Sequence, residues 1–128
     1  MKGLFLLLCC ALLLRGCAGE DAVLLGFSGQ LTGDHADLGV QGRNGATLAV
    51  EDINARGGVA GRPLKLLSRD DGDTPQTAVA ADTALLKAGV VAIIGHMTSS
   101  QTLAALPTVA AAGRVMVSPT TATPALSG

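Results

Sequence analysis

Four short apolar runs alternate with three segments of helical periodicity. The runs lie at residues 22–27, 64–67, 90–94 and 115–117. Unbroken apolar runs of this length are typical of strands that are buried on both faces of a sheet. Strands that alternate with helices form parallel sheets, and the helices cover both faces. The sequence therefore predicts an α/β fold with a doubly wound parallel sheet.

The three segments between the runs carry start and stop signals for helices. Their expected ranges are 38–56, 75–88 and 100–112. A glycine follows each range, as is common at helix ends. Thr74 and Pro75 place a capping hydroxyl and a first-turn proline before the second helix. Ligands of doubly wound sheets bind beyond the carboxyl ends of the strands, so the loops at these ends are where a site is expected.

Hydroxyl side chains gather in the loop after the third apolar run. Thr98, Ser99, Ser100 and Thr102 come where the third helix is expected to start. The first N–H groups of a helix have no partner within it, and the helix dipole places partial positive charge there. Neutral hydroxyls can donate further hydrogen bonds. This combination favours reversible binding of a carboxylate.

No pattern for catalysis or for a cofactor is found. Residues 95–99 lack the Gly-x-Ser-x-Gly spacing of a serine hydrolase. The Gly-Lys-Ser/Thr ending of a phosphate loop is absent as well. The glycine-rich turn 26–33 follows a strand, but Asp70 lies 37 residues after Gly33, whereas a dinucleotide site needs an acid about 20 residues on. The chain is predicted not to be an enzyme and to carry no cofactor.

Metal and nucleic-acid binding are not indicated either. His35 and His96 are far apart in the chain, and each is expected to be a solvated or a core histidine. Asp70, Asp71 and Asp73 are expected to form a solvated strand end and a helix cap, because calcium loops need more oxygen ligands. Nine Lys and Arg against ten Asp and Glu leave no cationic surplus for a phosphate backbone.

The first residues have the layout of an export signal. Lys2 precedes an apolar stretch that is too short to span a bilayer, and small residues follow it. Residues 1–16 are therefore predicted to be a signal peptide. Leu14-Arg15-Gly16-Cys17 resembles a lipobox, which would make Cys17 a lipidation site, although Arg15 is unusual there. Ordinary cleavage after Ala18 is the alternative. Both predict export, the first with a membrane anchor; the resemblance described next implies that the destination is the periplasm.

The order of motifs from about residue 22 to 127 resembles a known family, the type I periplasmic solute-binding proteins of the branched-chain amino acid class. The resemblance rests on Gly29-Gln-Leu-Thr-Gly33, Asn44-Gly-Ala, Asp52-Ile-Asn-Ala, Gly61-Arg-Pro-Leu, Asp70-Asp71, Val91-Ala-Ile-Ile-Gly-His96, Ser99-Ser-x-Thr102 and Ser118-Pro119. Members have two α/β lobes that close on a solute. The resemblance implies that residues 17–128 are the first part of an N-terminal lobe, either as a fragment or from a truncated gene.

The resemblance also implies a function and its partners. Family members are extracytoplasmic receptors that deliver amino acids or related small carboxylates and amides to the permease subunits of an ABC importer. In the family, the residues at Ser99 and Thr102 hold the ligand carboxylate. The loop after the fourth strand holds the ammonium, and here it has Ala122 where a hydroxyl is usual. The ligand-binding residues implied are Ser99, Ser100, Thr102, Thr120, Thr121 and Thr123. A secreted enzyme and a membrane-linked sensor domain stay open as alternatives.

Overall fold

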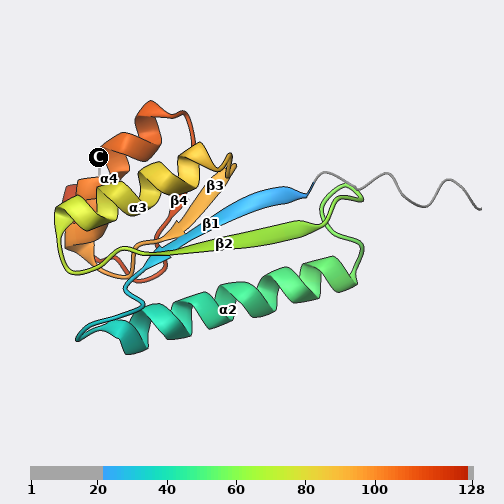
Figure 1. Ribbon diagram of the computed structural model, residues 1–128, viewed down its shortest axis with the longest axis horizontal. Coiled ribbons are helices and arrows are strands. Elements are labelled where there is room, and N and C mark those ends of the chain that lie inside the picture. The colour runs from blue at the N-terminus through green and yellow to red at the C-terminus, as the bar shows by residue number, and fades with distance from the viewer. Residues whose placement is uncertain (1–21, 127–128) are drawn as a thin grey trace, which may run out of the picture.

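Residues 22–126 are described by the computed structural model, and they form a sheet with helices on both faces (Figure 1). The elements follow the order β1 (Val23–Gly29), α2 (Ala36–Ala55), β2 (Leu64–Asp70), α3 (Pro75–Lys87), β3 (Ala92–Gly95), α4 (Ser99–Ala111), β4 (Val115–Val117) and a final 3-10 turn (Pro124–Leu126). The predicted alternation of strands and helices is confirmed. The predicted signal peptide and Cys17 lie outside the described residues.

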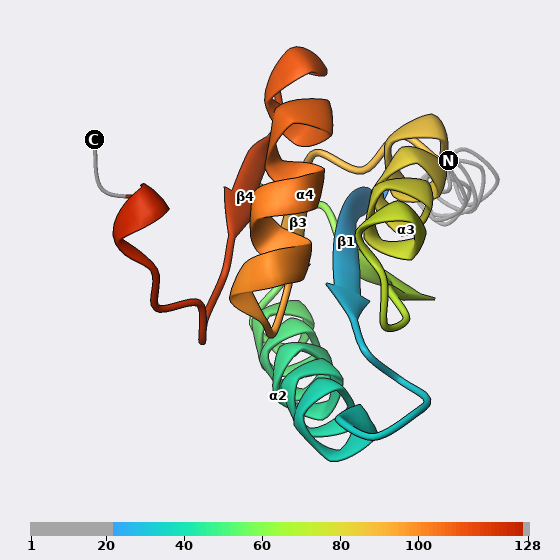
Figure 2. The same ribbon diagram turned by 90° about the vertical axis from the view of Figure 1, so that its left-hand side faces the viewer.

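The sheet is parallel throughout, with the strand order β2-β1-β3-β4. The chain moves from β1 to β2 on one side and then crosses to β3 on the other, so the strand order reverses between β1 and β3. Helix α2 covers one face, and α3 and α4 cover the other (Figures 1 and 2). The doubly wound arrangement that the sequence predicts is therefore confirmed.

Each face of the sheet has its own apolar packing. On the α2 side, a Cβ added to Gly42 would meet Met97 and Phe27, so the helix rests directly on these two buried side chains. On the other side, Leu85 of α3 and Val109 of α4 pack with Ile93 of β3, and all three are fully buried. Burying such side chains contributes about 1.5–3 kcal/mol each. The sheet is thus held from both sides near β1 and β3.

Three strand boundaries differ from the expected ones by more than one residue. Strand β2 continues to Asp70 rather than ending at residue 67. Strand β1 continues to Gly29 because Ser28 and Gly29 remain in register with the end of β2. Strand β3 begins at Ala92 rather than at residue 90. Val90 is fully buried, but its N–H donates to Leu85 O at the end of α3 (3.4 Å). Its apolar side chain therefore belongs to the core while its backbone closes the helix.

Candidate functional site

The carboxyl ends of the strands bring four loops together at one edge of the sheet, on the left in Figure 1. Hydrogen bonds join these loops across the edge. Leu31 N–H donates to Asp70 Oδ1 (3.0 Å), which links the loops after β1 and β2. Gln101 Nε2 donates to Gly72 O (2.9 Å), and Thr120 Oγ1 donates to Met97 O (2.8 Å). The loops at the edge where the sequence predicts a site are therefore held together by hydrogen bonds.

The first turn of α4 leaves backbone N–H groups open at this edge. Thr98 is the N-cap residue, but its side chain makes no capping hydrogen bond. The first helical hydrogen bond runs from Thr102 N–H to Thr98 O (3.1 Å). The N–H groups of the three residues between them have no acceptor within the described chain. They carry the partial positive charge of the helix end and can receive an anion.

Ser99 has the one uncommitted hydroxyl among the residues expected to bind there from α4. The Ser100 hydroxyl donates to Gln101 Oε1 (2.5 Å), and Thr98 Oγ1 donates to the same oxygen (3.1 Å). Thr102 is buried and donates to Thr98 O (2.8 Å). Ser99 is half-buried and its hydroxyl makes no hydrogen bond within residues 22–126. It remains free to donate to a bound group.

The threonines after β4 have different hydrogen-bond partners. Thr121 Oγ1 is 2.7 Å from Thr102 Oγ1, so the structure brings these two expected residues together. Thr120 contacts the Met97 carbonyl, whereas Thr123 accepts a hydrogen bond from Ala125 N–H (3.3 Å) within its own loop. The loop is fixed by the Ser118 hydroxyl, which donates to the His96 carbonyl (2.7 Å).

Two cavities flank the first turns of α4. The larger, of about 400 Å³, is lined by Gln30, Asp34 and His35 after β1, by Asp73 before α3, and by Thr98, Ser100 and Gln101. The smaller, of about 210 Å³, is lined by both polar and apolar side chains, among them Thr102 and Thr121. Of the expected residues, Ser100 thus lines the larger cavity and Thr102 and Thr121 line the smaller, whereas Ser99, Thr120 and Thr123 line neither.

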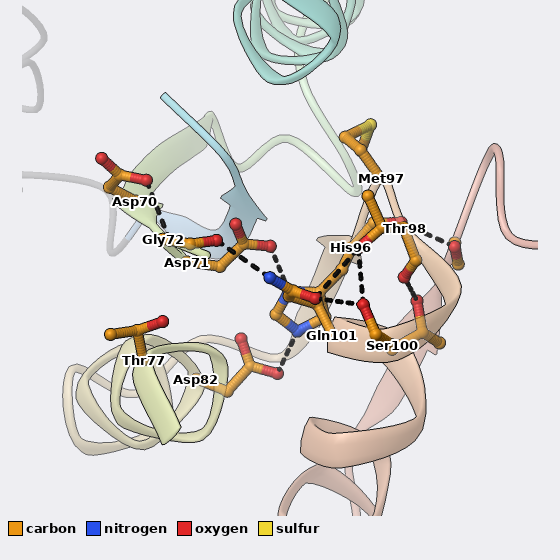
Figure 3. Close-up of polar contacts among 12 residues, drawn as sticks. Asp70, Asp71, Gly72, Thr77, Asp82, His96, Met97, Thr98, Ser100 and Gln101 are labelled. Carbon is orange, nitrogen blue, oxygen red and sulfur yellow. Dashed lines mark hydrogen bonds and ion pairs between the residues drawn. The ribbon is translucent and has the colours of Figure 1, made fainter. Parts of the chain in front are cut away.

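A buried charged cluster lies directly beneath this helix end (Figure 3). His96 is fully buried, and its Nδ1 is 2.5 Å from Asp71 Oδ2. Its Nε2 is 3.1 Å from Asp82 Oδ2, and both aspartates are buried as well. His96 is thus a core histidine, one of the two environments expected. The prediction of a solvated Asp71 is wrong, because this carboxylate turns inward to pair with the imidazole.

The two carboxylates keep the imidazole charged. Burial by itself would lower the pKa of His96, but the hydrogen bonds to Asp71 and Asp82, together with their charges, raise that pKa to about 9. At neutral pH the ring is therefore an imidazolium, and each nitrogen donates to one carboxylate. The cluster joins the end of β2, the middle of α3 and the end of β3. It therefore holds in place the segment from which the first turn of α4 begins.

Asp70, beside the cluster, faces the loop after β1. Burial opposes its ionisation, but hydrogen bonds from the Thr32 hydroxyl (2.5 Å) and from the Leu31 and Gly72 N–H groups hold its pKa below the usual value. The side chain is thus an ionised anchor for two loops. The expected cap of α3 is Thr74, whose hydroxyl accepts from Thr77 N–H (3.2 Å), as predicted.

Gly95 is the residue that lets His96 reach its partners. Its φ is +137°, a backbone conformation that side chains rarely adopt. A Cβ at this position would lie 1.9 Å from Ser28 O. Only glycine therefore allows the end of β3 to approach β1 this closely and to direct His96 under α4.

One residue of the buried cluster, Asp82, can be recognised in the sequence by its position. Asp82 occupies a position on the apolar face of α3, together with Ala78, Ala81 and Leu85. A charged residue on such a face needs a partner.

Among residues 22–126, no set of three or more His, Cys, Asp or Glu is arranged to hold a metal ion. In that same part of the chain, no helix has the length and apolarity to cross a membrane.

Comparison with known proteins places this fold in one class, the periplasmic binding proteins. The model of the family described as "Periplasmic binding protein" matches residues 22–128. The chain belongs to this family, in its type I branched-chain amino acid class. The expected resemblance is thereby confirmed, and with it the fold class.

Individual relatives agree with this assignment. A Leu/Ile/Val/Thr-binding protein of Salmonella typhimurium is 36% identical over 128 residues, which cover 99% of this chain and 35% of the relative. The branched-chain amino acid transporter substrate binding protein of Streptococcus pneumoniae, solved with isoleucine, has a TM-score of 0.78 and 31% identity over 80% of this chain and 30% of its own. A fatty acid ABC transporter substrate-binding protein from Thermomonospora curvata has a TM-score of 0.67 and 31% identity, over 77% of this chain and 25% of its own. The chain thus spans about a third of the length of its relatives, which are binding proteins and not enzymes.

Proposed function

We propose that this chain forms part of an extracytoplasmic receptor that binds a small carboxylate, such as an amino acid, and delivers it to the permease subunits of an ABC importer. One observation carries the proposal. The first turn of α4 presents open backbone N–H groups and the free Ser99 hydroxyl where the strand order reverses. A carboxylate satisfies these donors and is favoured by the helix dipole.

The other expected residues have supporting roles in this proposal. The hydroxyl protons of Ser100 and Thr102 are committed to Gln101 and Thr98, so these residues hold the turn in shape and offer oxygen atoms. The oxygens of Thr120, Thr121 and Thr123 lie in the loop after β4 and can accept hydrogen bonds from a solute ammonium. The enzyme alternative has no nucleophile pattern to support it, and the relatives are named for binding.

Solute capture also requires the rest of the protein. In this proposal, residues 17–128 supply the first part of one lobe, and a second lobe closes over the bound solute. Closure excludes water and strengthens each hydrogen bond to the carboxylate. A binding test therefore needs a two-lobed protein. A hybrid that joins residues 17–128 to the remaining part of the Salmonella relative provides one, because the two sequences align over this whole segment.

Ser99→Ala in this hybrid should weaken amino acid binding by roughly 10- to 150-fold, because a hydrogen bond to a charged group is worth about 1.5–3 kcal/mol. Calorimetric titration with leucine, isoleucine, valine and threonine measures the change. Thr47→Ala is the matched control. It also removes one hydroxyl group, but from the exposed surface of α2. An affinity that is unchanged in Ser99→Ala contradicts the proposed carboxylate site.

Export and anchoring form a separate part of the proposal. We expect removal of residues 1–16 and attachment of lipid to Cys17, so that Cys17→Ala converts a membrane-associated product into a soluble one. Fractionation of cells that express the wild-type and variant chains measures the difference. A soluble wild-type product that begins at Gly19 would instead support ordinary signal cleavage.

A further inference from the structure

The larger cavity beside α4 is lined only by polar residues and is rich in negative charge. Asp34 and Asp73 face it from two different loops, and no lysine or arginine lines it. Neither carboxylate makes an ion pair or a hydrogen bond within residues 22–126. The ion pairs of that region lie elsewhere, between Arg56 and Asp52 and within the His96 cluster. No ion pair of the described residues therefore compensates the two carboxylates.

The side chains on the α4 wall of this cavity offer acceptors rather than donors. The hydroxyl protons of Thr98 and Ser100 are both directed to Gln101 Oε1. The Gln101 amide nitrogen in turn donates to Gly72 O. These hydroxyls can therefore interact with a ligand only through the lone pairs of their oxygens, as acceptors. The wall thus complements the two carboxylates.

Gln30 is a buried amide without a partner at the same cavity. Its exposed fraction is 4%, yet its side chain makes no hydrogen bond within the described chain. Its Nε2 lies 3.3 Å from the point where a Cβ on Gly33 would stand, and both Asp73 carboxylate oxygens lie 3.2 Å from that point. Gly33 has a φ of +84°, which favours glycine, and so leaves the space between these groups open. The side chain is held in place by its surroundings, and its amide group is free to hydrogen-bond to a ligand in the cavity.

These features define the chemistry of the ligand. Two carboxylates disfavour an anion, and polar walls disfavour an aliphatic group. No set of three metal-ligating side chains is present in residues 22–126. A group with one positive charge and several N–H donors matches the acceptors that Asp34, Asp73 and the hydroxyl oxygens supply. We propose that this cavity is a binding subsite for a small organic cation, an alkylammonium or a guanidinium group.

The subsite does not depend on the proposed carboxylate site, and the test keeps them apart. Methylguanidinium is titrated into the isotope-labelled chain while the amide NMR signals are followed, with sodium chloride at equal ionic strength as a reference. Saturating shifts are expected at the Gln30 side chain and at Ser100. Asp73→Asn should weaken binding about five- to tenfold, because it removes a charge from the acceptor set. Asp73 is exposed, so this variant is expected to fold.

Two controls decide the outcome. Glu51→Gln removes an equally exposed carboxylate from α2, away from the cavity, and should leave methylguanidinium binding unchanged. Tetramethylammonium has the same charge but no N–H, and should bind much more weakly. Equal binding of the two cations, or an equal loss in Asp73→Asn and Glu51→Gln, overturns the subsite and leaves only a negative surface.

Arginine distinguishes two sources of the cation. If arginine shifts the Ser99 and Gln30 signals together, the cation is the side chain of a solute whose carboxylate sits at α4. If it shifts Gln30 alone, the cation is a separate amine. Both results support the subsite, whereas an absence of shifts at Gln30 with arginine and methylguanidinium contradicts it. The Ser99→Ala hybrid reports independently on the carboxylate.

Discussion

Replacement of His96 by leucine should lower the free energy of unfolding by about 3–5 kcal/mol, the cost of removing one partner from a buried charge pair. The reason is electrostatic rather than steric. His96 is fully buried between Asp71 and Asp82, and the second oxygen of each carboxylate already lacks a hydrogen-bond partner. Without the imidazolium, two buried carboxylates have no cation, and each must take up a proton or draw in water.

Chemical denaturation of residues 17–128 measures this loss, and two further variants identify its cause. His35→Leu alters the other histidine, which is exposed, and should change the unfolding free energy by no more than about 0.5 kcal/mol. The double variant His96→Leu with Asp82→Leu removes one of the stranded carboxylates. It should be more stable than His96→Leu alone. If the double variant is the less stable of the two, the charge argument is wrong and the loss comes from packing.

The fold could be predicted from the sequence because its signals are local. Each strand contains a short apolar run, which Lys65 interrupts in β2, and each helix has its own end signals, such as Thr74 and Pro75 at the start of α3 and Gly113 after α4. Parallel pairing then follows from the alternation alone. The strand boundaries are harder to predict where the backbone and the side chain of a residue have different roles. At Val90, the N–H group donates to the end of α3 while the side chain lies in the core.

The candidate site could be predicted only to the level of its loops. The position of Ser99 at a helix start follows from local sequence, and the structure places it there. Which hydroxyl is free depends on side-chain directions that a sequence does not contain, such as the turn of Ser100 and Thr98 toward Gln101. The partners of His96 lie 14 and 25 residues away on other elements. Only the sheet brings them together.

The same cluster should make stability fall as the solution becomes alkaline. The pKa of His96 is raised from 6.5 to about 9 in the folded protein, so the folded state binds the proton more tightly than the unfolded chain. The added stability is complete below pH 6.5, and it is lost as the pH rises through 9. A shift of this size corresponds to about 3 kcal/mol. Unfolding free energies measured at pH 6 and pH 9.5 should therefore differ by about that amount.

The charge of this one ring accounts for the expected pH dependence, and a neutral replacement tests it. His96→Gln keeps a polar side chain between Asp71 and Asp82 but cannot carry a proton at neutral pH. Its stability should be lower than that of the wild type at pH 6 and should change much less between pH 6 and pH 9.5. If the variant loses as much stability as the wild type over this range, another group is responsible. If the wild type shows no loss, His96 is already neutral at pH 6, and the link between the cluster and the α4 turn is not ionic.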